Sequence, residues 1–141
     1  MERSMSTEFA ELASLLLDRA ARLERVIGAS LSGTGLAVPH WLILGALHRA
    51  SDGLTMTGLA NVVGLPGATL TRSVDRLVDQ ALLHRTVDAL DRRRVLVHLT
   101  DRGRSSYHAV APRVDEAVEA QLSNLAAWEH EALAGLLAKR S

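Results

Sequence analysis

The chain has 141 residues, 48% hydrophobic and 3% aromatic, and its 16 basic side chains balance 16 acidic ones. This length suits one domain, or a compact domain plus a dimerisation element. The absence of cysteine excludes disulfides, thiolate metal ligands and cysteine redox sensing. No stretch approaches the roughly 20 apolar residues of a membrane-spanning helix, and the start of the sequence lacks a signal-peptide pattern. We therefore expect a cytoplasmic protein with no membrane partner.

The first predicted element is a helix over residues 7–31, whose apolar residues recur at helical spacing. Leu15 and Leu17 widen its apolar stripe beyond what a lone surface helix needs. Such a stripe suggests burial against a second chain, although the helix could instead close over its own core. A glycine-containing loop follows at 32–38, and Pro39 suits the first turn of a second helix over about 39–50.

Two further helices with a tight turn between them are predicted at about 56–63 and 66–81. Thr55 is a candidate N-cap for the first, and Gly64 is well placed to end it in the left-handed conformation. The buried face of the second helix consists of aliphatic residues: Leu70, Val74, Leu77, Val78 and Ala81. Its opposite face carries Thr69, Arg72 and Arg76, at spacings of three and four residues.

A β-hairpin comes next, because "LLHRTV" at 82–87 and "RVLVHL" at 94–99 are rich in β-branched and aliphatic residues. Its tip lies near residues 89–93, and the stretch from Arg85 to Arg104 has six arginines against three aspartates. Thr100 is predicted to cap a long following helix, which Pro112 should kink or break. A last amphipathic helix is expected over 127–139.

The order helix, turn, helix, hairpin is typical of a winged helix-turn-helix. The second helix of that unit reads base edges in the major groove, and the narrow minor groove attracts an inserted arginine from the hairpin. A neighbouring aspartate can orient the guanidinium before DNA arrives. The alternative for "DRRR" at a hairpin tip is a solvated turn that keeps the edge soluble.

Residues 54–104 resemble the winged helix-turn-helix of the MarR (multiple antibiotic resistance regulator) family. The resemblance is carried by "TLTRSVDRLVDQALL", by "DRR" at 91–93 followed by "LT" at 99–100 and Gly103, and by "PHW" at 39–41. It implies a mainly α fold with a small β-hairpin wing, a winged helix-turn-helix plus a helical dimerisation region. We expect a single MarR-like domain over 1–141, with dimerisation helices in 7–37 and 101–141 and a DNA-binding lobe in 39–100.

The same resemblance implies a homodimer that binds double-stranded DNA at a pseudo-palindromic site. Asp91 would orient an arginine at the wing tip, and Arg92 or Arg93 would enter the minor groove, with Arg94 beside them. The residues expected to face the major groove and its phosphates are Thr69, Thr71, Arg72 and Arg76. The chain departs from the family at Pro66 and Gly67, where the family often starts the recognition helix with serine.

Family members often receive a small aromatic or phenolic effector between the dimerisation helices and the DNA-binding lobe. By that resemblance, Arg19, His40 and Trp41 would line such a pocket, although Trp41 could simply belong to the core. The six histidines include no pair at a spacing of three or four residues, so we expect no metal site.

His48, Ser51 and Asp52 lie too close in sequence for a hydrolytic triad, so we expect no catalytic residue, no cofactor and no enzyme activity. The leading prediction is a cytoplasmic, homodimeric repressor that a small molecule releases from its operator. The alternative, kept open by the zero net charge, is a winged-helix protein-interaction module without specific DNA binding.

Overall fold

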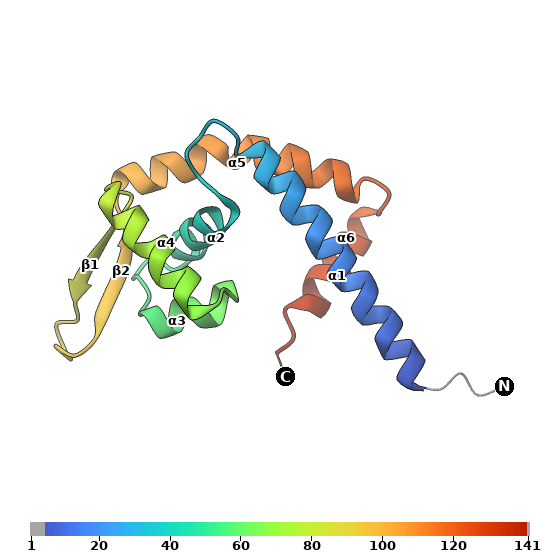
Figure 1. Ribbon diagram of the computed structural model, residues 1–141, viewed down its shortest axis with the longest axis horizontal. Coiled ribbons are helices and arrows are strands. Elements are labelled where there is room, and N and C mark those ends of the chain that lie inside the picture. The colour runs from blue at the N-terminus through green and yellow to red at the C-terminus, as the bar shows by residue number, and fades with distance from the viewer. Residues whose placement is uncertain (1–4, 141) are drawn as a thin grey trace. The chain divides into compact units, whose positions relative to one another are not determined.

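The computed structural model describes residues 5–140, with side chains from residue 8 onwards. In this part of the chain the elements are helices and one two-stranded antiparallel hairpin (Figure 1). The elements are α1 (Met5–Ser30), α2 (Val38–Arg49), α3 (Met56–Val63), α4 (Gly67–Asp79), β1 (Leu83–Val87), β2 (Val95–Leu99), α5 (Asp101–Leu122) and α6 (Ala127–Leu137). The predicted mainly α fold with a β-hairpin is confirmed. None of the described helices is both long and apolar enough to cross a membrane.

The chain divides into two compact units. One is Leu31–Pro112, which holds α2, α3, α4, the hairpin and the start of α5; we call it the lobe. The other combines the described part of Met1–Ser30 with that of Arg113–Ser141 and holds α1, the rest of α5 and α6; we call it the helical unit. Helix α5 continues through Pro112, so the proline does not break it.

The core of the lobe is aliphatic, as the shortage of aromatic residues requires. Helices α2, α3 and α4 and both strands contribute its fully buried side chains, which include Ile43, Leu44, Leu59, Val74, Leu77, Leu83 and Val97. Leu54, just before α3, adds a short antiparallel bridge to Val97 at the inner edge of the hairpin. The hairpin is thereby anchored to the helix-turn-helix at its base, while its loop extends away from the core (Figure 1).

Three local sequence signals position these elements. The Thr55 hydroxyl accepts a hydrogen bond from the Gly58 N–H at 3.0 Å and caps α3, and Gly64 ends that helix with φ of 65°. The Thr100 hydroxyl accepts from the Gly103 N–H at 2.9 Å and so caps α5. Each of these three predictions is confirmed.

The predicted end of α4 is wrong. The helix stops at Asp79, and Ala81 is exposed in the left-handed conformation with φ of 59° instead of lying on the buried face. The Ala81 N–H bonds to the Val78 carbonyl and the Leu82 N–H to the Leu77 carbonyl, which is a Schellman ending. Such an ending normally contains glycine, so an alanine at this position carries no signal for it. The predicted start also moves by one residue, because Pro66 is the N-cap and Gly67 the first helical residue.

Candidate nucleic-acid interface

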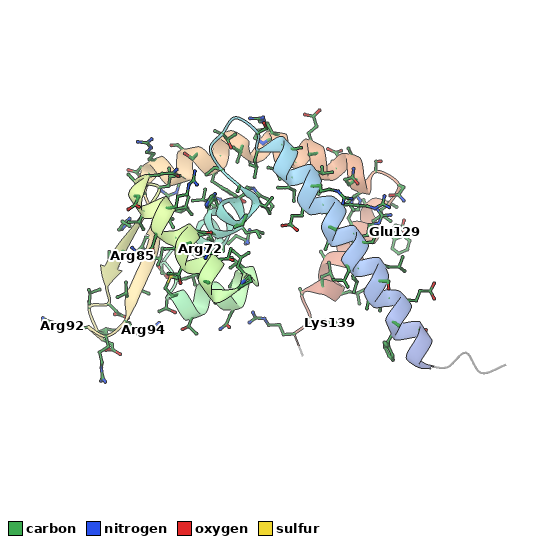
Figure 2. All side chains as sticks on the ribbon, viewed as in Figure 1. Arg72, Arg85, Arg92, Arg94, Glu129 and Lys139 are labelled. Atoms are coloured by element: carbon green, nitrogen blue, oxygen red, sulfur yellow. The ribbon has the colours of Figure 1, made fainter. Side chains whose placement is uncertain are left out.

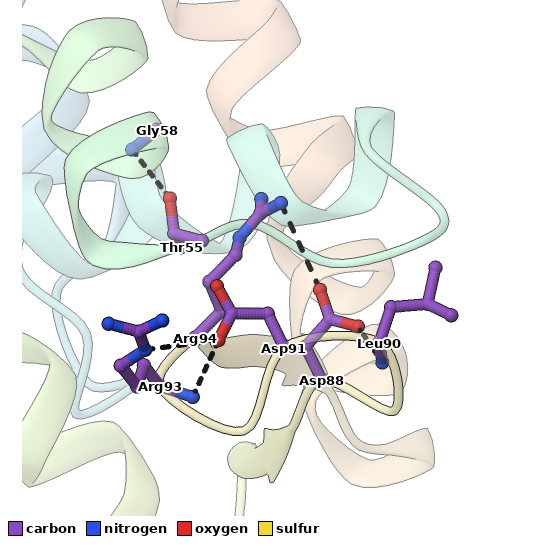
Figure 3. Close-up of polar contacts among 7 residues, drawn as sticks. All are labelled: Thr55, Gly58, Asp88, Leu90, Asp91, Arg93 and Arg94. Carbon is purple, nitrogen blue, oxygen red and sulfur yellow. Dashed lines mark hydrogen bonds and ion pairs between the residues drawn. The ribbon is translucent and has the colours of Figure 1, made fainter.

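The loop that joins β1 to β2 is closed by its own backbone and by two aspartates (Figure 3). The Asp88 N–H donates to the Arg94 carbonyl, and the Arg94 N–H to the Asp91 carbonyl, both at 2.9 Å. Asp88 Oδ1 accepts from the Leu90 N–H at 2.9 Å, and Asp91 Oδ1 accepts from the Arg93 N–H at 3.0 Å. Two successive Asx turns therefore fix the backbone of the loop.

The same two carboxylates face two of the three arginines. Asp91 Oδ1 lies 3.7 Å from Nε of Arg93, and Asp88 Oδ2 lies 3.9 Å from Nη1 of Arg94. The side chain of Arg93 is 96% exposed, and Arg92 is exposed as well. Ion pairs this long with an exposed arginine contribute little to stability. The aspartates therefore orient the two guanidinium groups and leave them accessible to an anion. Asp88 is a site residue that the sequence reasoning missed, although an aspartate at the end of a strand is a usual Asx-turn signal.

Helix α4 presents the other predicted DNA-contacting residues on its outer surface. Thr71, Arg72 and Arg76 are exposed, and Thr69 is half-buried. On the same helix, Asp75 forms an ion pair with Arg85 of β1. Figure 2 places the side chain of Arg72 on α4, that of Arg85 beside β1, and those of Arg92 and Arg94 at the far end of the hairpin. The lobe thus gathers cationic side chains from one helix and one hairpin.

His40, at the start of α2, is buried. Its Nδ1 accepts a hydrogen bond from the Ala37 N–H at 3.0 Å, so its ring helps to cap α2. Burial lowers the pKa of His40 below its usual 6.5, and the nearby charge of Arg76 lowers this pKa further. His40 is therefore neutral at pH 7 and holds its acceptor nitrogen toward the backbone. Arg76, predicted to face DNA, also acts electrostatically on the lobe's interior.

The three predicted effector-pocket residues fall in different units. His40 and the half-buried Trp41 are neighbours on α2 in the lobe, whereas Arg19 lies on α1 in the helical unit. Arg19 lines a cavity of about 540 Å³ within that unit, at the side of α1 and the ends of α5 and α6. The other lining residues are mainly leucines: Leu16, Leu17, Leu23, Leu122, Leu125, Leu133 and Leu137. The grouping of Arg19, His40 and Trp41 into one pocket stays a prediction.

The histidines pair by ring contact. His84 and His98 are opposite each other across the two strands, with ring centroids 5.1 Å apart, and His98 forms a hydrogen bond with Thr86 at 2.8 Å. The rings of His48 and His108 meet edge to face at 4.9 Å. Within residues 5–140, no three histidines or carboxylates are grouped so as to hold a metal ion.

Comparison with known proteins places this architecture among bacterial regulators. The model of the MarR family matches residues 34–94. Wild-type MarR from E. coli without ligand is 27% identical, with a TM-score of 0.76 over 89% of this chain and 93% of that one. A mutant E. coli MarR complexed with operator DNA is 26% identical, with a TM-score of 0.78 over 95% and 96% of the two chains. BpsR from Bordetella bronchiseptica, whose DNA binding is regulated by 6-hydroxynicotinic acid, is 25% identical, with a TM-score of 0.77 over 89% of each chain.

Proposed function

We infer that this chain is a transcriptional regulator of the MarR family, whose model matches residues 34–94 and whose E. coli member has a similar fold. We propose that it acts as a homodimeric repressor in the cytoplasm. It binds a pseudo-palindromic operator in duplex DNA, and a small-molecule effector releases it. We propose no catalytic activity and no cofactor. The structure of E. coli MarR on operator DNA, at 26% identity, supports DNA as the partner.

One observation carries the DNA-binding proposal: the ordered, arginine-bearing loop of the hairpin stands beside a helix with exposed basic residues. Arg92, Arg93 and Arg94 lie at the hairpin tip, and Arg72 and Arg76 lie on the exposed side of α4. A helix in the major groove and a cationic loop in the adjacent minor groove require this combination. Thr69, Thr71 and Asp91 complete the proposed interface, the first two on α4 and Asp91 as the residue that orients Arg93.

The helical unit supports the dimer. Large apolar side chains of α1 and α6 are exposed in the single chain, among them Phe9, Leu12, Leu15, Leu17, Trp128 and Leu136. Together with the leucine-lined cavity beside Arg19, they form a group of exposed large apolar side chains in one unit, and such groups usually mark an interaction surface. We propose that a second copy of the chain covers them, because a symmetric dimer would also supply the second lobe that a pseudo-palindrome needs.

The effector proposal rests on the relatives and on three residues. In BpsR the DNA binding is regulated by a hydroxylated aromatic acid. We propose that this chain takes a small aromatic or phenolic effector. A guanidinium such as that of Arg19 binds an anionic group, and an indole such as that of Trp41 packs on an aromatic ring; His40 stays a predicted contact.

A fluorescence-anisotropy titration tests DNA binding. The full chain is titrated into a labelled mixed-sequence duplex at low salt, with a single strand of the same composition as the comparison. Saturable binding to the duplex that weakens steeply as salt rises supports the proposal. Absence of saturable duplex binding would favour the alternative, a winged-helix protein-interaction module.

A further inference from the structure

The tip of the hairpin carries an apolar side chain that the folded lobe does not use. Leu90 is 98% exposed and stands between Asp88 and Arg92 in the loop. Turns at hairpin tips are normally built from polar residues and glycine, so a loop that needed only solubility has no use for leucine there. The exposure is also not a local irregularity, because the Leu90 N–H is tied to Asp88 Oδ1 at 2.9 Å.

The surroundings of Leu90 indicate what could cover it. Val87 and Val95 are partners in the strand register at the outer end of the hairpin, and they are 59% and 41% exposed. Arg93 and Arg94 follow in the loop, and their side chains are 96% and 57% exposed. The exposed Leu90 side chain next to the guanidinium groups fits a partner that has apolar groups in its interior and a row of negative charges on either side of them.

We propose that Leu90 acts as a wedge that enters a base step of the minor groove and partly unstacks it. This inference rests on the proposed function, since it assumes that the hairpin binds duplex DNA. Proteins that bind the minor groove insert leucine, isoleucine or phenylalanine between base pairs in this way and kink the duplex. The groove is about 6 Å wide, which admits one aliphatic side chain, while the flanking arginines reach the phosphates on its two walls.

The loop is already in the shape that such an insertion needs. The two Asx turns and the Asp88–Arg94 backbone bond fix the loop before DNA arrives, so less conformational entropy is lost on binding. Because unstacking costs least at flexible pyrimidine–purine steps, the wedge adds specificity for sequences that place such a step under the wing. Figure 3 shows the Leu90 side chain directed away from the loop and from the two aspartates.

The test uses a duplex that the wild-type chain has enriched from a random-sequence pool. A fluorescent adenine analogue, whose emission rises on unstacking, replaces single adenines in turn, and dyes at the two ends report bending. The variants are Leu90→Ala, Leu90→Met as the conservative replacement, and Val62→Ala as a matched control, since Val62 is an exposed aliphatic residue on α3. Truncation of so exposed a side chain leaves the fold intact, which thermal unfolding checks.

We expect the wild-type chain to raise emission at one step in each half-site and to bend the duplex. Leu90→Ala should abolish both signals. It should bind DNA about tenfold more weakly, because alanine buries less apolar surface in the complex than leucine does. Leu90→Met and Val62→Ala should keep both signals. Equal emission and bending for Leu90→Ala and wild type would overturn the wedge while leaving DNA binding intact.

Two other outcomes separate the inference from its premise. If the wild-type chain enriches no duplex at all, the proposed function fails and the wedge with it. A lipid bilayer also has phosphate groups beside an apolar interior. Cosedimentation with vesicles of anionic and neutral phospholipid tests whether Leu90 binds such a bilayer. Leu90-dependent vesicle binding, together with unchanged DNA bending, would reassign Leu90 to a membrane surface and overturn the proposal.

Discussion

Arg85 on β1 forms an ion pair with Asp75 on α4, so the hairpin and the helix beside it are joined by a side-chain contact as well as by the chain. Both side chains are partly exposed, and such a pair contributes at most about 1 kcal/mol to stability. Its effect is geometric: it fixes the base of the hairpin against the helix that is proposed to read the major groove. Nothing in the sequence pattern joins the two residues, because ten positions and a change of element separate them.

Removal of the wing arginine should change how DNA binding depends on salt. Arg93→Ala is expected to weaken duplex binding about tenfold and to reduce the slope of log affinity against log salt by about 1.8, because each of the two wings of a dimer loses one neutralised phosphate that contributes about 0.9. Anisotropy titrations over a salt series measure both quantities. Arg25→Ala is the matched control, because it removes one exposed charge from α1 and should leave the slope unchanged. The role of Arg93 would be contradicted by equal slopes for Arg93→Ala and wild type.

Substitution of Gly103 should destabilise the lobe strongly. A Cβ atom at this position would lie 2.0 Å from the backbone oxygen of Leu82, so the start of α5 would have to move away from the hairpin. We expect Gly103→Ala to reduce the free energy of unfolding by about 1–3 kcal/mol, measured by urea denaturation. Gly67→Ala is the control, since nothing lies within 4 Å of its Cβ; it should be neutral or stabilising by up to about 1 kcal/mol. Similar reductions for both variants would refute the steric explanation.

His40 should make stability depend on pH. Its pKa is lowered in the folded lobe by burial and by Arg76, so in the acidic range the unfolded chain binds the proton more tightly. The contribution of neutral His40 is fully present above the unfolded pKa of about 6.5 and is lost as the pH falls toward the folded pKa. Urea denaturation between pH 5 and 7.5 should show a steeper decline in stability for wild type than for His40→Gln, which keeps an acceptor at this position. Parallel curves would mean that His40 titrates alike in both states.

The exposed face of α1 should determine the oligomeric state. Leu12 and Leu16 lie four residues apart on this face, and the double variant Leu12→Glu with Leu16→Glu would bury unpaired carboxylates at the proposed interface. We expect a dimer for wild type and at least a hundredfold weaker association for the variant, measured by sedimentation equilibrium. The double variant Val62→Glu with Leu90→Glu places the same charge on two exposed aliphatic residues of the lobe and should remain dimeric. A monomeric wild type would contradict the dimer outright.

The elements that could be predicted are those with a local chemical signal. Thr55 and Gly64 mark the two ends of α3, Thr100 marks the start of α5, and the β-branched runs mark both strands. A run of β-branched residues and a helix cap each depend on interactions within a few neighbouring residues. A short stretch of sequence is therefore enough to predict them. The aspartate and arginines of the wing could be recognised for the same reason.

The features that escape prediction depend on contacts between distant residues or on backbone choices that several residues share. Ala81 takes a left-handed conformation because α4 must turn sharply into β1. Alanine rarely adopts this conformation, so its presence does not predict the turn. The exposure of Leu90 follows from the way Asp88 and Asp91 fold the loop. The lowered pKa of His40 follows first from its burial in the folded lobe and then from the charge of Arg76, which lies 36 positions further along the chain. The break expected at Pro112 is absent, since α5 continues through this residue.

Selection of bound sites from a pool of random duplexes tests the central claim most directly. The full chain at moderate salt should enrich an inverted repeat whose half-site centres are about 10–10.5 base pairs apart, because two lobes of a dimer would meet successive major grooves on one side of the duplex. Recovery of sequences with no shared motif, or of a single half-site without its inverted copy, would contradict a dimeric operator-binding regulator.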